Sequence, residues 1–271
     1  MAAGDRVVRW EKENGIATVW LSNAAKRNAM GRAFFEQLPE VMHEVYADDS
    51  VRAIIVAAEG PAFTVGLDLF DMSGTLSPEG SQIETRRKII TDVDRLQRAI
   101  GSVAESPVPT IAAIHGWCIG GGVDLTTCCD IRLASADMKL SVRETKIAIV
   151  ADLGTLQRLP KIISAGHVAE LAYTGKDVTA ARCKEIGLVN EVYADATALH
   201  VAAREMALEI AANSPLVVRG VKKVLKYGEG KSVQDGLDYV AAWNASFLLS
   251  DDLAEAMTAF FEKRRPNFHG K

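Results

Sequence analysis

The stretch at residues 111–134, IAAIHGWCIGGGVDLTTCCDIRLA, decides the fold class of this chain. Its apolar runs at 111–114 and 131–134 are typical of strands that are buried on both faces of a sheet. A run of three glycines at 120–122 and a short helical segment at 123–128 lie between these two runs. A strand, a glycine-bearing turn, a helix and a second strand in this order predict an α/β fold with crossover connections.

The same alternation extends toward the N-terminus. An Asn14-Gly15 pair between two β-rich runs is a hairpin signal, because both residues tolerate the positive φ angles of a tight turn. Apolar residues with helical spacing then precede another continuous apolar run. These patterns predict strands at 7–10, 16–21 and 53–57 and a helix at 32–46.

Turn-forming residues predict a surface loop at 74–81, and an amphipathic helix follows at 85–103. Toward its C-terminus, the chain becomes purely helical. We therefore predict a core at 1–195 and a helical oligomerisation region at 196–271 that packs on the core or on another subunit. The helices predicted in this second part are 196–212, 215–227, 233–249 and 252–263.

The composition excludes several functional classes. The 271 residues include 31 Lys and Arg against 35 Asp and Glu, and a net charge of −4 disfavours broad binding to nucleic acid. The four cysteines lack the spacing of a zinc site or a disulfide framework, which indicates reduced thiols. No signal-peptide pattern opens the chain, and no apolar run approaches the ~18 residues of a membrane span. We therefore expect a cytoplasmic protein that binds neither nucleic acid nor membranes.

Two glycine-bearing loops could place backbone amides beside a ligand. The run at 119–124 opens a helix, whose N-terminus favours developing negative charge. In the loop at 60–69, Gly66 could turn the amide of Leu67 toward the same ligand. Each loop taken alone also fits an ordinary tight turn. Neither has the G-x-G-x-x-G pattern, so a nicotinamide cofactor is not expected.

Five short motifs are spaced along the chain. Ala-Lys-Arg-Asn-Ala occupies 25–29, F-x-x-G-x-D-L occupies 63–69, and H-G-x-x-x-G-G-G occupies 115–122. Gln-Arg-Leu at 157–159 and Phe-Glu-Lys-Arg at 261–264 complete the set. Together they resemble the crotonase (enoyl-CoA hydratase/isomerase) superfamily over nearly the whole chain. The resemblance implies a ClpP-like spiral of ββα units with a C-terminal helical trimerisation region, in homotrimers or homohexamers.

The same resemblance implies an acyl-CoA thioester substrate and a proton shift through an enolate. The backbone amides of Leu67 and Gly121 would bind the thioester oxygen, and fixed donors of this kind contribute about 3–4 kcal/mol each. CoA is part of the substrate, and neither a metal ion nor another cofactor is implied. The residues implied in substrate and CoA binding are Ala24, Lys26, Arg27, Ala29, Val65, Gly66, Asp68, Leu69, Gly120, Phe260 and Lys263.

Three acids point to one branch of the family. In its hydratases, two Glu residues hold a water at positions that correspond to Asp124 and Glu144 here. Asp152 adds a third acid where the hydratases have a small residue. This pattern, with the sequence at 151–160, resembles the enzymes that isomerise 3,5-dienoyl-CoA to 2,4-dienoyl-CoA in the β-oxidation of unsaturated fatty acids.

Such an isomerisation removes a proton at C2 and adds one at C6, and one fixed carboxylate does not reach both carbons. We assign Glu144 as the base at C2 and Asp152 as the acid at C6; the opposite assignment stays open. Asp124 lies in the first turn of a predicted helix, whose dipole should lower its pKa. Its charge should then raise the pKa of Glu144. Taken singly, any of these acids could be a solvated group or a helix cap.

Two alternatives are compatible with the same motifs. The chain could be an enoyl-CoA hydratase or a 3-enoyl to 2-enoyl-CoA isomerase in which Asp152 takes no part. It could also be a non-catalytic CoA- or RNA-binding protein of this fold, although the net charge of −4 disfavours RNA.

Overall fold

The computed structural model describes residues 6–76 and 80–271. Its strands are β1 (Val8–Glu13), β2 (Ile16–Leu21), β3 (Ala53–Ala58), β4 (Thr110–Ile114), β5 (Trp117–Ile119), β6 (Ile131–Ser135), β7 (Lys139–Ser141), β8 (Val178–Thr179) and β9 (Glu191–Tyr193). Within the described residues, six of them form a sheet in the order β1-β2-β3-β4-β6-β9, and the others form a sheet in the order β5-β7-β8. β1 and β2 are an antiparallel hairpin, and the remaining neighbours in the larger sheet are parallel.

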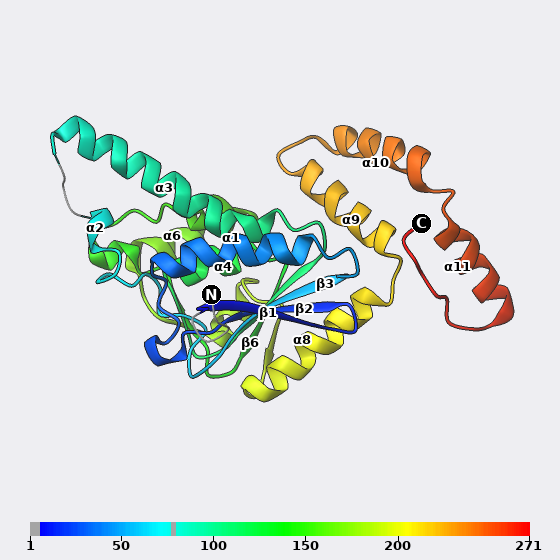
Figure 1. The fold of residues 1–271 in the computed structure, drawn as a ribbon, viewed down its shortest axis with the longest axis horizontal. Helices are drawn as coiled ribbons and strands as arrows, with labels where there is room; N and C mark the ends of the chain where they lie inside the picture. The colour runs from blue at the N-terminus through cyan, green and yellow to red at the C-terminus, as the bar shows by residue number, and fades with distance from the viewer. Residues whose placement is uncertain (1–5, 77–79) are drawn as a thin grey trace.

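Helices connect and cover these strands (Figure 1). The short 3-10 helices are η1 (Ala24–Lys26), η2 (Glu144–Ile147) and η3 (Leu159–Lys161). The α-helices are α1 (Arg32–Tyr46), α2 (Ser73–Leu76), α3 (Gln82–Ala104), α4 (Gly121–Thr126), α5 (Thr155–Arg158), α6 (Ala165–Thr174), α7 (Ala180–Glu185), α8 (Ala196–Ala211), α9 (Pro215–Gly228), α10 (Val233–Phe247) and α11 (Asp251–Glu262).

The chain winds through the two sheets in repeated units. After β4, it turns at Gly116 into β5 of the smaller sheet and then enters α4. β6 leads into β7 of the smaller sheet in the same way. All residues of β3 and β4 are buried, as expected for parallel strands with both faces covered. The predicted α/β spiral of ββα units is confirmed.

Helices cover both faces of the larger sheet (Figure 1). On one face, α1 and α3 bury side chains such as Leu38 and Ile100. On the other face, α8 packs its apolar stripe, including Leu199 and Ala203, against β3, β4 and β6. Of the two placements predicted for the region 196–271, on the core or on another subunit, α8 takes the one on the core. α8 belongs to the core, and the separate helical part begins at α9.

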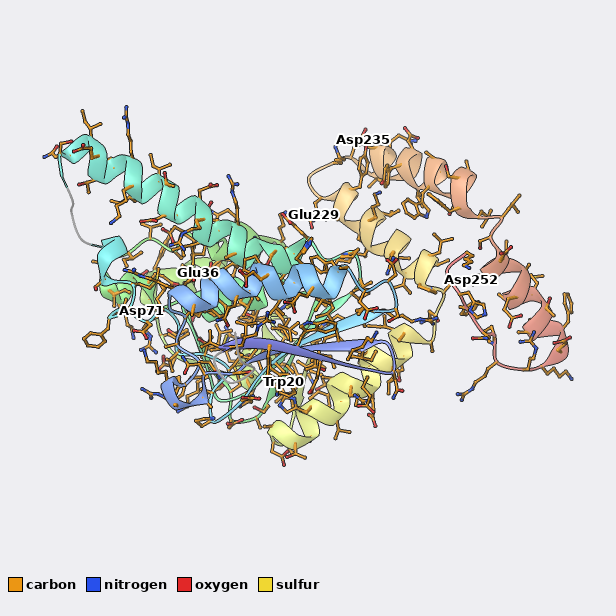
Figure 2. All side chains as sticks on the ribbon, in the orientation of Figure 1. Trp20, Glu36, Asp71, Glu229, Asp235 and Asp252 are labelled. Carbon is orange, nitrogen blue, oxygen red and sulfur yellow. The ribbon has the colours of Figure 1, made fainter. Side chains whose placement is uncertain are left out.

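α9, α10 and α11 form an arm that extends from the core (Figure 1). The Lys222 ammonium on α9 ties the arm to the core by pairing with Asp130 at 2.7 Å. Asp252 (Figure 2) links α11 to the start of α9 by accepting a hydrogen bond from the Ser214 hydroxyl. The arm nevertheless leaves many apolar side chains exposed: Val217, Val221, Leu225, Val233, Leu237, Phe247, Leu248, Leu249, Leu253, Met257, Phe260 and Phe261.

Some local predictions need correction. The predicted loop at 74–81 begins within the helix α2, and residues 77–79 of that loop lie outside the described residues. α3 begins at Gln82 rather than at residue 85, because Ser81 and Glu84 form a capping box there. β5, β7, β8 and β9 have two or three residues each, too few to produce a periodic pattern.

Two global properties follow from the described residues. No helix among them is long and apolar enough to cross a membrane. The thiols of Cys118, Cys128, Cys129 and Cys183 are free and buried.

Candidate active site

The two glycine-bearing loops lie side by side. The Thr64 amide donates to the Trp117 carbonyl at 2.8 Å, and the Ile119 amide donates back to the Thr64 carbonyl at 3.1 Å. A Cβ placed on Gly66, whose φ is +84°, would lie 2.8 Å from the Ile119 carbonyl oxygen and 3.8 Å from the Gly121 nitrogen. The approach therefore requires glycine at 66, and it brings the Leu67 segment next to the start of α4.

The amides of Leu67 and Gly121 are both available to a ligand. Met30 bonds to the residues on either side of Leu67, which turns the Leu67 amide away from Met30. Gly121 is the first residue of α4, where an amide has no partner inside the helix. Among the described residues, neither amide donates a hydrogen bond to the protein. The geometry fits the predicted oxyanion hole.

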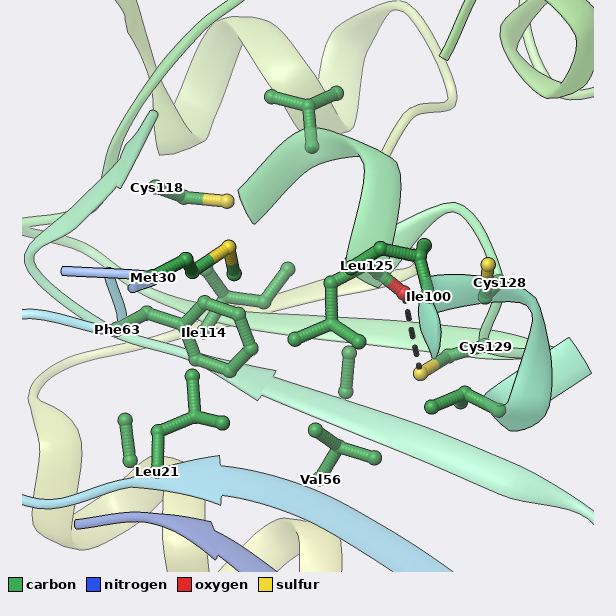
Figure 3. Packing of buried hydrophobic residues seen from close by; sticks show 14 of the residues in the cluster. Leu21, Met30, Val56, Phe63, Ile100, Ile114, Cys118, Leu125, Cys128 and Cys129 are labelled. Atoms are coloured by element: carbon green, nitrogen blue, oxygen red, sulfur yellow. Dashed lines mark hydrogen bonds between the residues drawn. The ribbon is translucent and has the colours of Figure 1, made fainter. Parts of the chain in front are cut away.

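Apolar packing behind this turn fixes it in place. Met30 is fully buried, and its Sδ would lie 2.9 Å from a Cβ on Gly121. Figure 3 shows Met30 among buried side chains that include Phe63, Cys118 and Leu125. Cys118 is thus a core residue, and burial raises the pKa of its thiol far above the usual range.

Asp124 is buried on α4 with 1% of its surface exposed. Its Oδ1 accepts a hydrogen bond from the Thr155 amide at 2.6 Å. Burial raises the pKa of Asp124, and the Thr155 groups and the charge of Arg158 act against this rise. The Thr155 hydroxyl is close by, although it makes no hydrogen bond of regular geometry with any described residue. The prediction that the helix dipole lowers this pKa is wrong, because desolvation of the carboxylate outweighs the short helix α4.

Glu144 lies at the start of η2 and faces the glycine turn. Its Oε1 would lie 3.1 Å from a Cβ on Gly120, and its Oε2 is buried with no partner among the described residues. Burial raises the pKa of Glu144 to about 7, and the charges of Asp124 and Asp152 act in the same direction. The predicted effect of Asp124 is present, but burial is the larger cause.

Asp152 lies on the loop between η2 and α5, at the exposed edge of the acid cluster. The residue is exposed, yet burial of its carboxyl group is the main cause that raises its pKa. Its charge raises the pKa of both Asp124 and Glu144, and Thr155, three residues further along the chain, donates its amide hydrogen to Asp124. The structure therefore brings the three predicted acids together.

Most residues predicted to bind substrate or CoA also gather here. The segment that holds Ala24, Lys26, Arg27 and Ala29 runs beside the loop of Gly66, where the Val65 amide donates to the Arg27 carbonyl at 3.2 Å. The Lys26 ammonium pairs with Asp68 at 2.9 Å.

Phe260 and Lys263 do not join this group. Phe260 is on α11, and Lys263 caps that helix at the far end of the arm, remote from α4 of the same chain (Figure 1).

Sequence reasoning missed contacts around the Asp152 loop. Gln97 and Arg158 both donate hydrogen bonds to its carbonyl groups. Arg158 belongs to the motif at 157–159, which marked this residue but predicted no role for it. Gln97 is an exposed residue of an amphipathic helix and gave none.

A family model described as enoyl-CoA hydratase/isomerase matches residues 11–271. The chain belongs to this family and has the crotonase fold. It is 42% identical over 267 residues to the mitochondrial Delta(3,5)-Delta(2,4)-dienoyl-CoA isomerase of Dictyostelium discoideum, covering 97% of this chain and 91% of that protein. It is 39% identical over 269 residues to the peroxisomal Delta(3,5)-Delta(2,4)-dienoyl-CoA isomerase of Arabidopsis thaliana, covering 97% and 95%. The crystal structure of enoyl-CoA hydratase from Bacillus anthracis superimposes with a TM-score of 0.89 at 29% identity, covering 98% of this chain and 100% of that one.

Proposed function

We propose that this protein is a dienoyl-CoA isomerase that converts 3,5-dienoyl-CoA to 2,4-dienoyl-CoA in the β-oxidation of unsaturated fatty acids. The observation that carries the proposal is the convergence of Asp124, Glu144 and Asp152 beside two unpaired amides. The names of the two relatives above support the same activity.

The oxyanion amides start the reaction. The Leu67 and Gly121 N–H groups bind the thioester oxygen, and they stabilise the enolate that forms when the C2 proton leaves. Neither amide has a partner among the described residues, so no acceptor of the described part of the chain competes with the thioester oxygen. Fixed donors need no reorganisation as the charge develops.

Two carboxyl groups move the proton. Glu144 takes it from C2, and its pKa of about 7 suits a group that must accept a proton near neutral pH. Asp152 delivers a proton to C6, which completes the shift of the double bonds. Asp124 accepts a hydrogen bond from the Thr155 amide, which favours the charged form of its carboxyl group. That charge raises the pKa of Glu144. The reverse assignment of Glu144 and Asp152 uses the same groups and predicts different exchange behaviour.

Substrate and CoA are held by the loops around this cluster, in our proposal with no metal ion and no further cofactor. The isomerisation moves protons and electron pairs within one molecule, so it needs no oxidant or reductant. The protein's net charge of −4 supports the expectation that it binds no nucleic acid. We likewise propose that it does not act at membranes.

The arm supports assembly into a homotrimer or homohexamer. Phe260 and Phe261 are each more than 70% exposed on α11, beside a series of other exposed apolar side chains. Such a surface is typical of an interface between subunits. Phe260 and Lys263 would then reach the acyl-CoA site of a neighbouring copy. Light scattering should give the mass of three or six chains, and a monomer would contradict this.

The predicted cytoplasmic location stays a prediction. The relatives from Dictyostelium discoideum and Arabidopsis thaliana are named as mitochondrial and peroxisomal. Cell fractionation would test the location of this protein.

Isomerisation of a synthetic 3,5-dienoyl-CoA in D2O tests the proposed function directly. We expect conjugated 2,4-dienoyl-CoA with deuterium at C6. Deuterium at C4 would instead indicate a 3-enoyl to 2-enoyl isomerase that makes no use of Asp152. Hydration of crotonyl-CoA at a comparable rate would favour a hydratase, and binding of CoA thioesters without turnover would favour a non-catalytic protein.

A further inference from the structure

The Asp152 side chain receives no direct support from its neighbours. Its carboxylate makes no hydrogen bond of regular geometry with any other described residue, and the residue is exposed. A carboxyl group that must deliver a proton to one carbon needs a fixed position, because an error of 1 Å can lower a rate about 10²-fold. The position of Asp152 therefore depends on its backbone.

Side chains hold this backbone at three points between residues 152 and 155. Gln97 Nε2 donates to the Asp152 carbonyl oxygen at 2.6 Å. Arg158 Nη1 donates to the Leu153 carbonyl oxygen at 3.1 Å. Asp124 Oδ1 accepts from the Thr155 amide at 2.6 Å.

Gln97 provides a rigid anchor because of where it sits on α3. Its neighbours Leu96, Ala99 and Ile100 are buried in the core, so this part of the helix is fixed to the body of the protein. Gln97 itself is exposed and reaches across to a loop 55 residues away in sequence. The hydrogen bond connects the loop to the core at the residue that bears the acid.

Arg158 holds the loop by folding back across Gly154. Gly154 has a φ of +122°, and a Cβ at this position would lie 1.7 Å from Arg158 Nη1. The glycine is therefore required both for the backbone turn and for passage of the guanidinium group. The positive charge of Arg158 also opposes the rise that burial causes in the pKa of Asp124.

We infer that Gln97 and Arg158 are positioning residues that hold the Asp152 carboxyl group in place for proton delivery at C6. The inference rests on the proposed function. It assigns the hydrogen bonds of these two side chains to the second proton transfer, because neither bond reaches the oxyanion turn or Glu144.

The test separates the two proton transfers. Exchange of the C2 proton with D2O needs Glu144 and the oxyanion amides, whereas isomerisation also needs Asp152. The variant Gln97→Met keeps the size of the side chain and removes the donor, and Gln97→Lys restores a donor. Arg98→Met is the matched control, because Arg98 is the adjacent, exposed residue that pairs with Asp94.

We expect Gln97→Met to lower kcat for isomerisation at least tenfold, with KM within about twofold and C2 exchange near the wild-type rate. Gln97→Lys should recover part of kcat, and Arg98→Met should match wild type. Arg158→Met should show the same separation of exchange from isomerisation; if it fails to fold, the Gln97 pair decides. An unchanged kcat in Gln97→Met would overturn the inference, and so would a parallel fall in exchange and isomerisation. Failure of the wild-type protein to isomerise the diene would instead contradict the proposed function.

Discussion

The oxyanion turn and the Asp152 loop both rely on a glycine with positive φ, but different atoms hold them. In the turn, main-chain groups bond to one another. The Gly120 amide donates to the Ser141 carbonyl at 2.9 Å, and the Ile119 amide donates to Thr64. The position of the oxyanion amides therefore follows mainly from the path of the backbone, with support from the Thr64 hydroxyl, which accepts from the Gly66 amide at 3.1 Å, and from Met30 packed behind the turn.

The Asp152 loop depends on side chains. Gln97, Arg158 and Asp124 each supply one of its hydrogen bonds. A single substitution can release one of these bonds while the sheets and the oxyanion turn stay intact. The two proton transfers therefore rest on separate supports, so mutation should separate them.

Removal of either of the two proposed proton carriers should have the largest effect on kcat. Glu144→Gln and Asp152→Asn should each lower kcat for isomerisation by about 10²–10⁴, the usual contribution of general acid–base catalysis, with acyl-CoA binding nearly unchanged. The two variants should differ in C2 exchange. Glu144→Gln should lose it, because the base is gone, whereas Asp152→Asn should retain it.

The reverse assignment of base and acid predicts the opposite exchange pattern. Exchange that is retained in Glu144→Gln and lost in Asp152→Asn would therefore show that Asp152 is the base and Glu144 is the acid. Full isomerase activity in Asp152→Asn would remove Asp152 from the mechanism. Both rates can be followed by mass spectrometry of the acyl-CoA in D2O.

A change in the oxyanion turn should have the next largest effect. In Gly66→Ala, the new Cβ would meet the Ile119 carbonyl oxygen at 2.8 Å, and the φ of +84° is unfavourable for alanine. We expect kcat to fall about 10²–10³-fold, as when one oxyanion donor is lost. C2 exchange should fall with it, in contrast to Asp152→Asn.

Gly101→Ala is the matched control for this substitution. Gly101 lies in α3, and a Cβ there would meet no atom within 4 Å. Alanine should preserve activity and stabilise the helix by about 0.5–1 kcal/mol. If Gly66→Ala kept its C2 exchange as Gly101→Ala does, the backbone-held turn would have no role in enolate formation.

The same comparison explains what the sequence could predict. The strand at residues 111–114 and the glycines of the oxyanion turn carry local patterns, because continuous burial and positive φ restrict the residue types. The fold and the two glycine-bearing loops were accessible for this reason, whereas the pairing of the Leu67 and Gly121 amides came from the family resemblance. Which part of the helical region packs on the core could not be predicted, because α8 has the period of any amphipathic helix and the sequence does not say which surface it covers.

The acids were accessible only in part. Their positions came from the family resemblance, but the sign of the pKa shift of Asp124 depends on burial, which a helical position alone does not determine. The anchor at Gln97 joins residues 55 positions apart through one exposed side chain. No periodicity or turn signal marks such a contact, so it required the three-dimensional structure.

The burial of Glu144 should carry a measurable and smaller effect, on stability. Its pKa rises from 4.5 to about 7 on folding, so the folded protein binds this proton more tightly than the unfolded chain does. The free energy of unfolding should therefore contain a contribution that is fully present below pH 4.5 and is lost as the pH rises to about 7.

Glu144→Gln removes this dependence with little change in shape. We expect the variant to gain up to about 3 kcal/mol over wild type between pH 5 and pH 8, as measured by urea unfolding at both values. Equal pH dependence in the two proteins would show that Glu144 ionises in the folded state as it does in the unfolded chain. Glu144 would then have no raised pKa that suits a base near neutral pH.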